Sequence, residues 1–429
     1  MMQLALGIDL GTSGVRSAVI AADGTVLSMA RGSYGPNVDD RRDPECWWKA
    51  VSECLHAQMQ ALRDDGHSPF DIAGLAVDGT SGSLVLTDAA LRPVSRALMY
   101  DDGGFVDEAV IIARHAPTSH VANGPGSALT RALKLVSEDT GKQAVHLLHQ
   151  ADFIAARLMG QGGHTDVNNA LKTGLDPETG MWPDWMTGLP LPSALLPKAH
   201  RPGEVIATVS AEKARAFGLS SALKVHAGTT DSIAAFLAAT DPAPGHAVTS
   251  LGTTLAVKLM STRRIDVPGL GLYAHRLGDG WLVGGASNTG GGVLRQLLPQ
   301  ADLGQLSTRI DPAVSSSLDY YPLVKPGERF PINDPSLQPR VTPRPDDDAH
   351  FLHGLLESMA RIERDAYASI VEHGATAPNM VYTAGGGASN SVWTEIRSRV
   401  LGLNIETTPH TEAAVGVAKL AQKELRSTL

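Results

Sequence analysis

The chain of 429 residues carries 36 lysine and arginine residues against 45 aspartate and glutamate residues, a formal net charge of −9. Binding to a phosphate backbone needs clustered basic residues, so this acidic composition argues against nucleic-acid partners and favours small metabolites. At roughly 150 residues per domain, the length predicts two or three domains, and we expect two large lobes.

The two cysteines, Cys46 and Cys54, lie in one predicted amphipathic helix, which excludes a disulfide framework. The N-terminus shows no basic region followed by a long apolar core, and no stretch approaches the ~18 apolar residues that cross a bilayer. We therefore expect a cytoplasmic protein with no membrane partner, and we leave open whether it is a monomer or a homodimer.

The first motif, over residues 6–20, is a pair of apolar runs joined by glycines, hydroxyls and one carboxylate. Backbone N–H groups around Gly11, Thr12 and Ser13 are free to approach an anion closely, which favours a strand pair whose turn cradles phosphate. Asp9 would repel a bare phosphate and therefore suggests a cation such as Mg²⁺. An ordinary hairpin turn is the alternative. The glycine spacing matches neither a dinucleotide fingerprint nor a P-loop.

A second strand-to-turn motif follows in the first half of the chain. The short apolar run 72–77 leads into a polar turn, which places Asp78 and Ser81 at a sheet edge. Three segments around it are predicted as helices: residues 44–62, 105–115 and 144–158.

A third carboxylate stands between a strand and a helix. The apolar run 225–230 reads as a strand that ends in a turn, and residues 232–239 read as a helix. Asp231 is therefore expected as the N-cap or a first-turn residue of that helix.

The motif of the first hairpin then returns. Residues 251–254 repeat the Leu-Gly-Thr-hydroxyl string of residues 10–13, again between two apolar runs. A weak internal repeat of this kind predicts two related lobes, each offering a phosphate hairpin to a shared cleft, with chance recurrence as the alternative.

Glycines also mark the last third of the chain. A short strand at 381–384 leads into a triple glycine at 385–387, and a helix follows over 393–401. Residues 311–348, rich in Pro, Asp and Ser, are expected as an extended surface segment with little helix. Two more helices are predicted, over 351–373 and 411–427.

Taken together, these motifs resemble those of the FGGY carbohydrate kinases, a branch of the superfamily of actin, Hsp70 and hexokinase-like ATPases. The resemblance extends from about residue 4 to residue 421. Five strings carry it, in the family's order and spacing: residues 7–16, 227–231, 250–254, 385–390 and 412–416.

The resemblance implies an α/β protein with a two-lobed, ribonuclease H-like ATPase fold and an active site in the cleft between the lobes. The N-terminal lobe, residues 1–240, is expected on the sugar and phosphate side, and the C-terminal lobe, residues 241–429, on the nucleotide side. Whether the last helix, 411–427, packs back on the first lobe is left open.

The resemblance also implies an ATP-dependent carbohydrate kinase, in which the γ-phosphoryl group of MgATP passes to a sugar hydroxyl. ATP and Mg²⁺ are the implied cofactors, and a sugar is the implied partner. Asp231 is then the general base for the hydroxyl proton, with a helix cap as the alternative. Asp9 orders Mg²⁺ through water, and Thr12 faces the transferring phosphate. Arg16 is expected near the phosphate, with a surface ion pair as the alternative.

For the nucleotide, the resemblance points to hydroxyls and glycines of both hairpins and to the glycine-rich turn. These residues are Gly11, Thr12, Ser13, Gly252, Thr253, Gly386, Gly387, Asn390 and Trp393. Absent side chains at the triple glycine let adenine lie against the backbone, and Trp393 is expected to cover the ring by stacking. Core packing is the alternative for this tryptophan.

For the sugar, the turn from Asp78 to Ser81 resembles that of D-ribulose kinases more than the Ser-Gly-Gln-Met-His pattern of bacterial xylulokinases. Asp78, Ser81, Asp102 and Asp231 are the expected sugar contacts. Gly104 stands where many members have arginine. We expect phosphorylation of the C5 hydroxyl of a ketopentose, with D-ribulose favoured and D-xylulose or a pentitol as alternatives.

Two other classes of protein compete with a sugar kinase. A non-kinase ATPase of the same superfamily has no base placed to activate a sugar hydroxyl, so Asp231 argues against it. A sugar-sensing regulator is expected to carry a helix-turn-helix extension or a basic arm, and neither accompanies these motifs.

Overall fold

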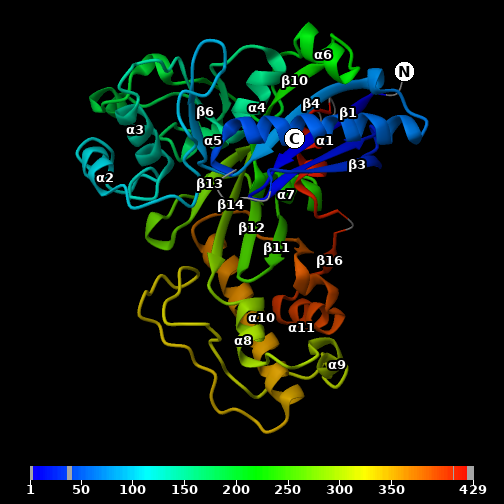
Figure 1. Cartoon of the computed structure of the whole chain (residues 1–429). Helices are drawn as coiled ribbons and strands as arrows, with labels where there is room; N and C mark the ends of the chain where they lie inside the picture. The colour runs from blue at the N-terminus through cyan, green and yellow to red at the C-terminus, as the bar shows by residue number, and fades with distance from the viewer. Residues whose placement is uncertain (1–2, 36–40, 409, 423–429) are drawn as a thin grey trace. The chain divides into compact units, whose positions relative to one another are not determined.

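The computed structural model describes residues 3–35, 41–408 and 410–422, and contacts within the chain group it into two compact units (Figure 1). Unit 1 consists of Met1–Ala238, His275–Gly278 and Glu412–Leu429. Unit 2 consists of Ala239–Ala274 and Asp279–Thr411. None of the described helices is long and apolar enough to cross a membrane.

Unit 1 is built on a six-stranded mixed sheet with the strand order β3-β2-β1-β4-β10-β9. Its strands are β1 (Leu4–Leu10), β2 (Gly14–Ile20), β3 (Val26–Ser33), β4 (Ile72–Gly79), β9 (Val205–Thr208) and β10 (Lys224–Thr230). β1, β2 and β3 form an antiparallel meander, whereas β4 runs parallel to both β1 and β10. β1, β4 and β10 therefore end at the same edge.

Helices pack against this sheet. α1 (Pro44–Asp64) starts at the N-cap Asp43, whose side chain accepts a hydrogen bond from the backbone N–H of Glu45. α12 (Ala413–Leu420) contacts β1 so closely that a Cβ atom at Gly7 would overlap the carbonyl oxygen of Ala414. Glycine at this β1 position is thus required for the C-terminal helix to pack within unit 1.

The rest of unit 1 consists of two small sheets and short helices. They are β5 (Leu84–Thr87), β6 (His146–His149), β7 (His164–Asp166), β8 (Lys198–His200), α2 (Val106–Ala113), α3 (Ala128–Glu138), α4 (Gln150–Met159), α5 (Val167–Leu171), α6 (Ala211–Phe217) and α7 (Asp231–Ala239). The prediction of one helix over 144–158 is wrong, because its first part pairs with β5 as strand β6 and only the second part is helical.

Unit 2 contains a second six-stranded mixed sheet, in the order β13-β14-β12-β11-β15-β16. Its strands are β11 (His246–Leu251), β12 (Leu255–Ser261), β13 (Tyr273–Leu277), β14 (Gly280–Ser287), β15 (Met380–Ala384) and β16 (Ile405–Thr407). The residues of β13 from His275 onward are grouped with unit 1, although the strand pairs within this sheet. β11 and β12 are antiparallel, and β15 runs parallel to β11 and β16.

The helices of unit 2 are α8 (Gly291–Leu297), α9 (Leu303–Ser307), α10 (Asp348–Glu372) and α11 (Ser391–Leu401). α10 is the long predicted helix, and its apolar face, with Leu352, Leu355 and Met359, lies in the hydrophobic core. Residues 308–347 contain no helix or strand, which agrees with the extended segment expected there. The last helix ends at Leu420, and residues 423–427 of its predicted range, 411–427, lie outside the described residues.

The two sheets share a topology. In each, a hairpin (β1–β2 or β11–β12) is followed by a strand parallel to the first strand of the hairpin (β4 or β15). The internal repeat of the sequence therefore reflects a structural repeat, and the predicted α/β class with two related halves is confirmed.

Candidate active site

Three carboxylates gather at the edge of the unit 1 sheet where β1, β4 and β10 end. Asp9 of β1 stands opposite Asp78 of β4, and Asp78 stands opposite Thr229 of β10. Asp231 comes directly after β10 as the first residue of α7, and its carboxylate accepts a hydrogen bond of 2.6 Å from the backbone N–H of Ser232. In open α/β sheets, ligands bind outside the carboxyl ends of parallel strands, which is where these side chains lie.

The first two carboxylates are almost completely buried, with Asp9 4% and Asp78 0% exposed. Burial raises the pKa of Asp78 well above its usual range, and the neighbouring charges of Asp9 and Asp231 raise it further. Burial also raises the pKa of Asp9, although Asp78 and Arg16 lower it in part. The adjacent carboxylates repel each other unless a proton or a cation lies between them.

The Asp9–Asp78 pair has the donor set of a magnesium site. When both groups are ionised, neither oxygen of Asp78 accepts a hydrogen bond from a described residue. A buried carboxylate without a donor is costly, and a cation relieves that cost. Mg²⁺ is commonly held by one or two carboxylates, with water and phosphate oxygens completing its shell. Within the described ranges, no group of three or more His, Cys, Asp and Glu side chains is arranged to hold a metal.

The turn between β1 and β2 leaves its hydroxyls accessible. The N–H of Gly11 donates to the carbonyl of Gly14 at 3.0 Å, while Thr12 and Ser13 are exposed. The buried side chain of Tyr34 stabilises the turn, because its hydroxyl donates to the carbonyl of Gly11 at 2.9 Å. Sequence reasoning missed this tyrosine because no motif surrounds it.

Arg16 connects the carboxylate edge with the C-terminal segment of unit 1. Its Nη1 lies 3.4 Å from Oδ2 of Asp9, and its Nε lies 3.1 Å from Oε2 of Glu412. Glu412 also pairs with Arg31 at 3.0 Å. The Arg16 side chain is 39% exposed, so it remains accessible beside the turn and is not buried by these ion pairs.

The turn after β4 is held by a buried arginine that the sequence did not single out. Arg131 donates hydrogen bonds to the carbonyl oxygens of Tyr100 and Gly82 at 2.7 and 3.1 Å, and to those of Gly126 and Ser127. These partners are all backbone atoms, so no residue pattern announces them. The Ser81 hydroxyl, in the same turn, is buried without a hydrogen-bond partner among the described residues.

Asp102, predicted to contact sugar, is engaged within unit 1. Its Oδ1 accepts from Nη2 of Arg42 at 2.5 Å, and its Oδ2 accepts from the N–H of Met99 at 2.8 Å. Arg42 and the other hydrogen bonds lower the pKa of Asp102 more than burial raises it. The backbone of Gly104 has φ +86°, a conformation that disfavours the arginine usual at this position.

Unit 2 holds a separate pocket of about 540 Å³. Its lining includes Gly252, Thr253, Gly386, Gly387 and Asn390, which are all predicted nucleotide residues. The β11–β12 turn is fixed against α8 by backbone hydrogen bonds from Gly291 to Gly252 and from Gly292 to Thr253, both 2.9 Å. This pocket has the size and the sparse side chains of a small-molecule site.

Two of the predicted nucleotide residues also have structural roles. Asn390 is the N-cap of α11, where its Oδ1 accepts from the N–H of Trp393 at 3.1 Å, and its Nδ2 donates to the hydroxyl of Ser307. Trp393 is 2% exposed, and its indole N–H donates to the carbonyl of Leu356. The expectation of a ring free to stack is therefore corrected in favour of the alternative, core packing, although Trp393 is also among the residues that line the pocket.

Comparison with known proteins identifies both halves of the chain. The model of the N-terminal domain of the FGGY family of carbohydrate kinases matches residues 4–238, and that of the C-terminal domain matches residues 247–424. Two xylulose kinases are among the relatives. The one from Escherichia coli is 25% identical and the one from Streptomyces coelicolor 27%, and the alignments cover 97% and 98% of this chain and 89% and 87% of theirs.

Solved structures agree with the fold. A xylulose kinase from Rhodospirillum rubrum superposes with a TM-score of 0.83 at 22% identity, covering 97% of this chain and 89% of that one. A glycerol kinase from Plasmodium falciparum, solved with ADP, also gives 0.83 at 14% identity, covering 99% and 90%. Both likenesses show that this chain has the two-lobed α/β architecture.

Proposed function

The chain belongs to the FGGY family of carbohydrate kinases, and from this premise we propose that it transfers the γ-phosphoryl group of ATP to the C5 hydroxyl of a ketopentose. The observation that carries the proposal is the gathering of Asp9, Asp78 and Asp231 at one sheet edge, next to a turn with exposed hydroxyls. Phosphoryl transfer needs charge neutralisation, positioning and a proton acceptor, which these groups supply.

In the proposed mechanism, the Asp231 carboxylate accepts the proton of the sugar hydroxyl as the hydroxyl oxygen forms its bond to the γ-phosphorus. The bond from the γ-phosphorus to the bridging oxygen breaks, and ADP leaves. Asp9, next to Asp78, would hold Mg²⁺ through water, and the ion would supply positive charge that neutralises the phosphates. The exposed hydroxyls of Thr12 and Ser13, with the backbone of Gly11, receive the transferring phosphate.

Unit 2 is proposed to hold the nucleotide. Gly252 and Thr253 bind phosphates, and Gly386, Gly387 and Asn390 border the base. The pocket they line and the lack of acidic side chains among these five residues support this assignment. On the sugar side, Asp78 and Ser81 are proposed contacts, whereas Asp102 is proposed to shape the loop through its pairing with Arg42.

Two observations favour different sugars. The relatives named above are xylulose kinases, which favours D-xylulose. The Asp-Gly-Thr-Ser turn at 78–81 departs from the Ser-Gly-Gln-Met-His pattern of that group, which favours D-ribulose. ATP consumption measured with D-ribulose, D-xylulose, L-ribulose, xylitol, ribitol and glycerol decides between them. ATP hydrolysis that no sugar accelerates would instead identify a non-kinase ATPase.

The role of Asp231 is tested by Asp231→Asn, which keeps the shape of the side chain and removes its basicity. We expect sugar phosphorylation to be abolished while ATP binding, measured by calorimetry, is retained. A matched control is Asp347→Ala, which removes the N-cap of α10 in unit 2 and costs about 1 kcal/mol of stability. Turnover of Asp231→Asn at the wild-type rate would exclude the base assignment.

A further inference from the structure

The strand that precedes Asp231 is irregular at its end. β10 pairs with β4 through His226 opposite Ala76, and the pairing resumes with Thr229 opposite Asp78, so β10 contains one residue more than β4 over this stretch. Gly228 lies in this bulge, and a Cβ atom there would overlap the carbonyl oxygen of Val77. A bulge interrupts the hydrogen-bond ladder, so the last residues of β10 need support from elsewhere.

The support comes from α5. Asp166 is the N-cap of this helix, and its Oδ1 accepts from the backbone N–H groups of Asn168 and Asn169 at 2.9 and 3.0 Å. Its Oδ2 accepts from Nδ2 of Asn169 at 2.6 Å. The same Nδ2 donates to the carbonyl oxygen of Thr229 at 3.1 Å, and Nδ2 of Asn168 donates to the Thr229 hydroxyl at 3.1 Å.

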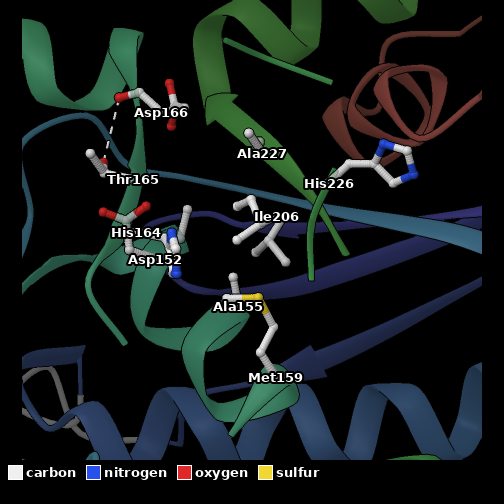
Figure 2. A pocket seen from close by; sticks show the side chains of 12 residues that line it. Asp152, Ala155, Met159, His164, Thr165, Asp166, Ile206, His226 and Ala227 are labelled. Atoms are coloured by element: carbon white, nitrogen blue, oxygen red, sulfur yellow. Dashed lines mark hydrogen bonds between the residues drawn. The ribbon is translucent and has the colours of Figure 1, made fainter. Parts of the chain in front are cut away.

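This network is buried within unit 1. Asp166, Asn169 and Thr229 are 2%, 1% and 0% exposed. Figure 2 shows Asp166 and the β10 residue Ala227 on a small cavity that is also lined by Asp152 and Thr165. The cavity measures about 10 Å³, room for about one water molecule, so a sugar does not enter it.

The buried amide is retained at a cost. Oδ1 of Asn169 has no hydrogen-bond partner among the described residues, although it is buried. Burying an unsatisfied acceptor destabilises a fold, so a side chain without this oxygen would suit packing better. What Asn169 contributes is therefore its Nδ2, which joins the Asp166 carboxylate to the end of β10.

We infer that Asn169, oriented by Asp166, is a positioning residue that fixes the carbonyl of Thr229 and thereby the carboxylate of Asp231 two residues later. The inference rests on the proposed role of Asp231 as the base. A base accepts a proton efficiently only when it is held within a fraction of an ångström of the productive position, and an unsupported bulge next to it would allow larger displacements.

The test is Asn169→Leu, which approximates the shape of asparagine and lacks both donors. Its control is Leu175→Ala, because Leu175 is 0% exposed and packs in the same small cluster as Val167 and Ala170 of α5 without reaching β10 through a polar contact. Both variants lose thermal stability. We expect kcat to fall roughly 10- to 100-fold in Asn169→Leu only, with KM for ATP unchanged.

A measurement independent of turnover accompanies the kinetics. Hydrogen exchange of the backbone amides at 229–232 should be faster in Asn169→Leu than in Leu175→Ala at equal loss of stability. Equal exchange there, or equal kcat in the two variants, would overturn the inference.

The Asp231→Asn variant separates the two proposals. If Asp231→Asn lowers phosphorylation to a small residual rate and Asn169→Leu lowers that rate no further in the double variant, both proposals hold. If Asp231→Asn remains active, the proposed base is wrong. If Asp231→Asn is inactive and Asn169→Leu turns over either D-xylulose or D-ribulose like the Leu175→Ala control, only the present inference fails.

Discussion

The hairpin ends of the two sheets differ in charge although their strands are arranged in the same way. In unit 1 the position before the Leu-Gly-Thr turn is Asp9, paired with Asp78 on the neighbouring parallel strand. In unit 2 the corresponding residue is Ser250, paired with Ala384. An acidic edge suits a cation and a proton acceptor, whereas a neutral edge with glycines and hydroxyls suits the phosphates of a nucleotide. One duplicated framework thus presents two different chemical surroundings, for which we propose two different kinds of ligand.

Buried carboxylates in the two units also differ in whether they form ion pairs. In unit 1, Asp78 and Asp166 are buried without an arginine or lysine ion pair among the described residues. In unit 2, fully buried Glu363 forms a bidentate pair with Arg397, with Nε–Oε2 and Nη2–Oε1 distances of 2.6 and 2.7 Å. Asp78 and Asp166 therefore keep buried acidity that ligands or protons must neutralise, whereas Glu363 is neutralised by an arginine of its own unit.

The strongest test of the charge difference between the two edges is a substitution of Asp9. Asp9→Asn should lower kcat roughly 10³-fold, because it removes a carboxylate from the proposed magnesium site. Ser250→Ala, at the corresponding exposed position of unit 2, should change kcat by no more than about twofold. The measurement is the coupled assay over a series of MgCl₂ concentrations, with EDTA as the metal-free limit. Comparable losses in the two variants would remove the functional distinction between the edges.

The second comparison, of buried carboxylates, predicts a pH dependence of stability. Burial, and to a lesser extent the charge of Asp152, raises the pKa of Asp166 from 3.8 to about 7, while hydrogen bonds from Asn169 and the nearby His149 lower it. The folded protein then binds a proton that the unfolded chain releases between about pH 4 and pH 7. This contribution to stability is complete below about pH 4 and is lost as the pH rises to 7.

Asp166→Asn should remove this dependence, which amounts to at most about 4 kcal/mol. The free energy of unfolding in urea is measured at pH 5 and at pH 7.5 for each protein. The change between the two pH values is then compared between the wild type and the variant. His164 and His200, which lie near Asp152, titrate in both proteins and cancel in that difference. An equal change in the two proteins would show that Asp166 is ionised throughout.

In unit 2 the same comparison predicts that breaking the Glu363–Arg397 ion pair destabilises the fold. Arg397→Met leaves the buried Glu363 without its cation and should lower the free energy of unfolding by about 3 kcal/mol. The double variant Arg397→Met, Glu363→Leu removes both charges and should recover a large part of that loss. Chemical denaturation of the three proteins tests this. A double variant no more stable than the single one would mean that the hydrogen bonds to Thr249 and Thr383, not the charges, dominate.

The sequence predicted the features that depend on neighbours along the chain. Glycines and hydroxyls between two apolar runs identified both hairpins, and a carboxylate at the end of a predicted strand identified Asp9, Asp78 and Asp231. The proposed role of each remains a prediction. The prediction of one helix over 144–158 was wrong because it ignored contacts between distant parts of the chain. Residues 146–149 form a strand only through their pairing with β5.

Other features depend on contacts that no local pattern encodes. Trp393 has helical spacing from the triple glycine, but it packs in the hydrophobic core, where its indole N–H donates to the carbonyl of Leu356 on α10. Arg131 and Asn169 bind backbone carbonyls, so the residue types of their partners give no signal. The residues that hold the candidate site in place through such contacts can therefore be identified only from the structure.

The smallest predicted effect separates two adjacent glycines of the unit 2 pocket. A Cβ atom at Gly387 would lie 2.7 Å from atoms of Leu251 and Trp393, whereas one at Gly386 would meet no atom within 4 Å. The absence of a side chain thus serves packing at Gly387 and leaves space for a ligand at Gly386. Gly387→Ala should therefore lower the melting temperature, and Gly386→Ala should not.

If a nucleotide lies against this turn, Gly386→Ala should raise KM for ATP by roughly 5- to 10-fold, about 1 kcal/mol of lost binding, and leave KM for the sugar unchanged. Steady-state kinetics with each substrate varied in turn, together with calorimetric melting, separate the two effects. An unchanged KM for ATP in Gly386→Ala would place the nucleotide elsewhere in the pocket. The glycine-rich turn would then play no part in the comparison, and the contrast between an acidic and a neutral edge would apply only to the β1–β2 and β11–β12 turns.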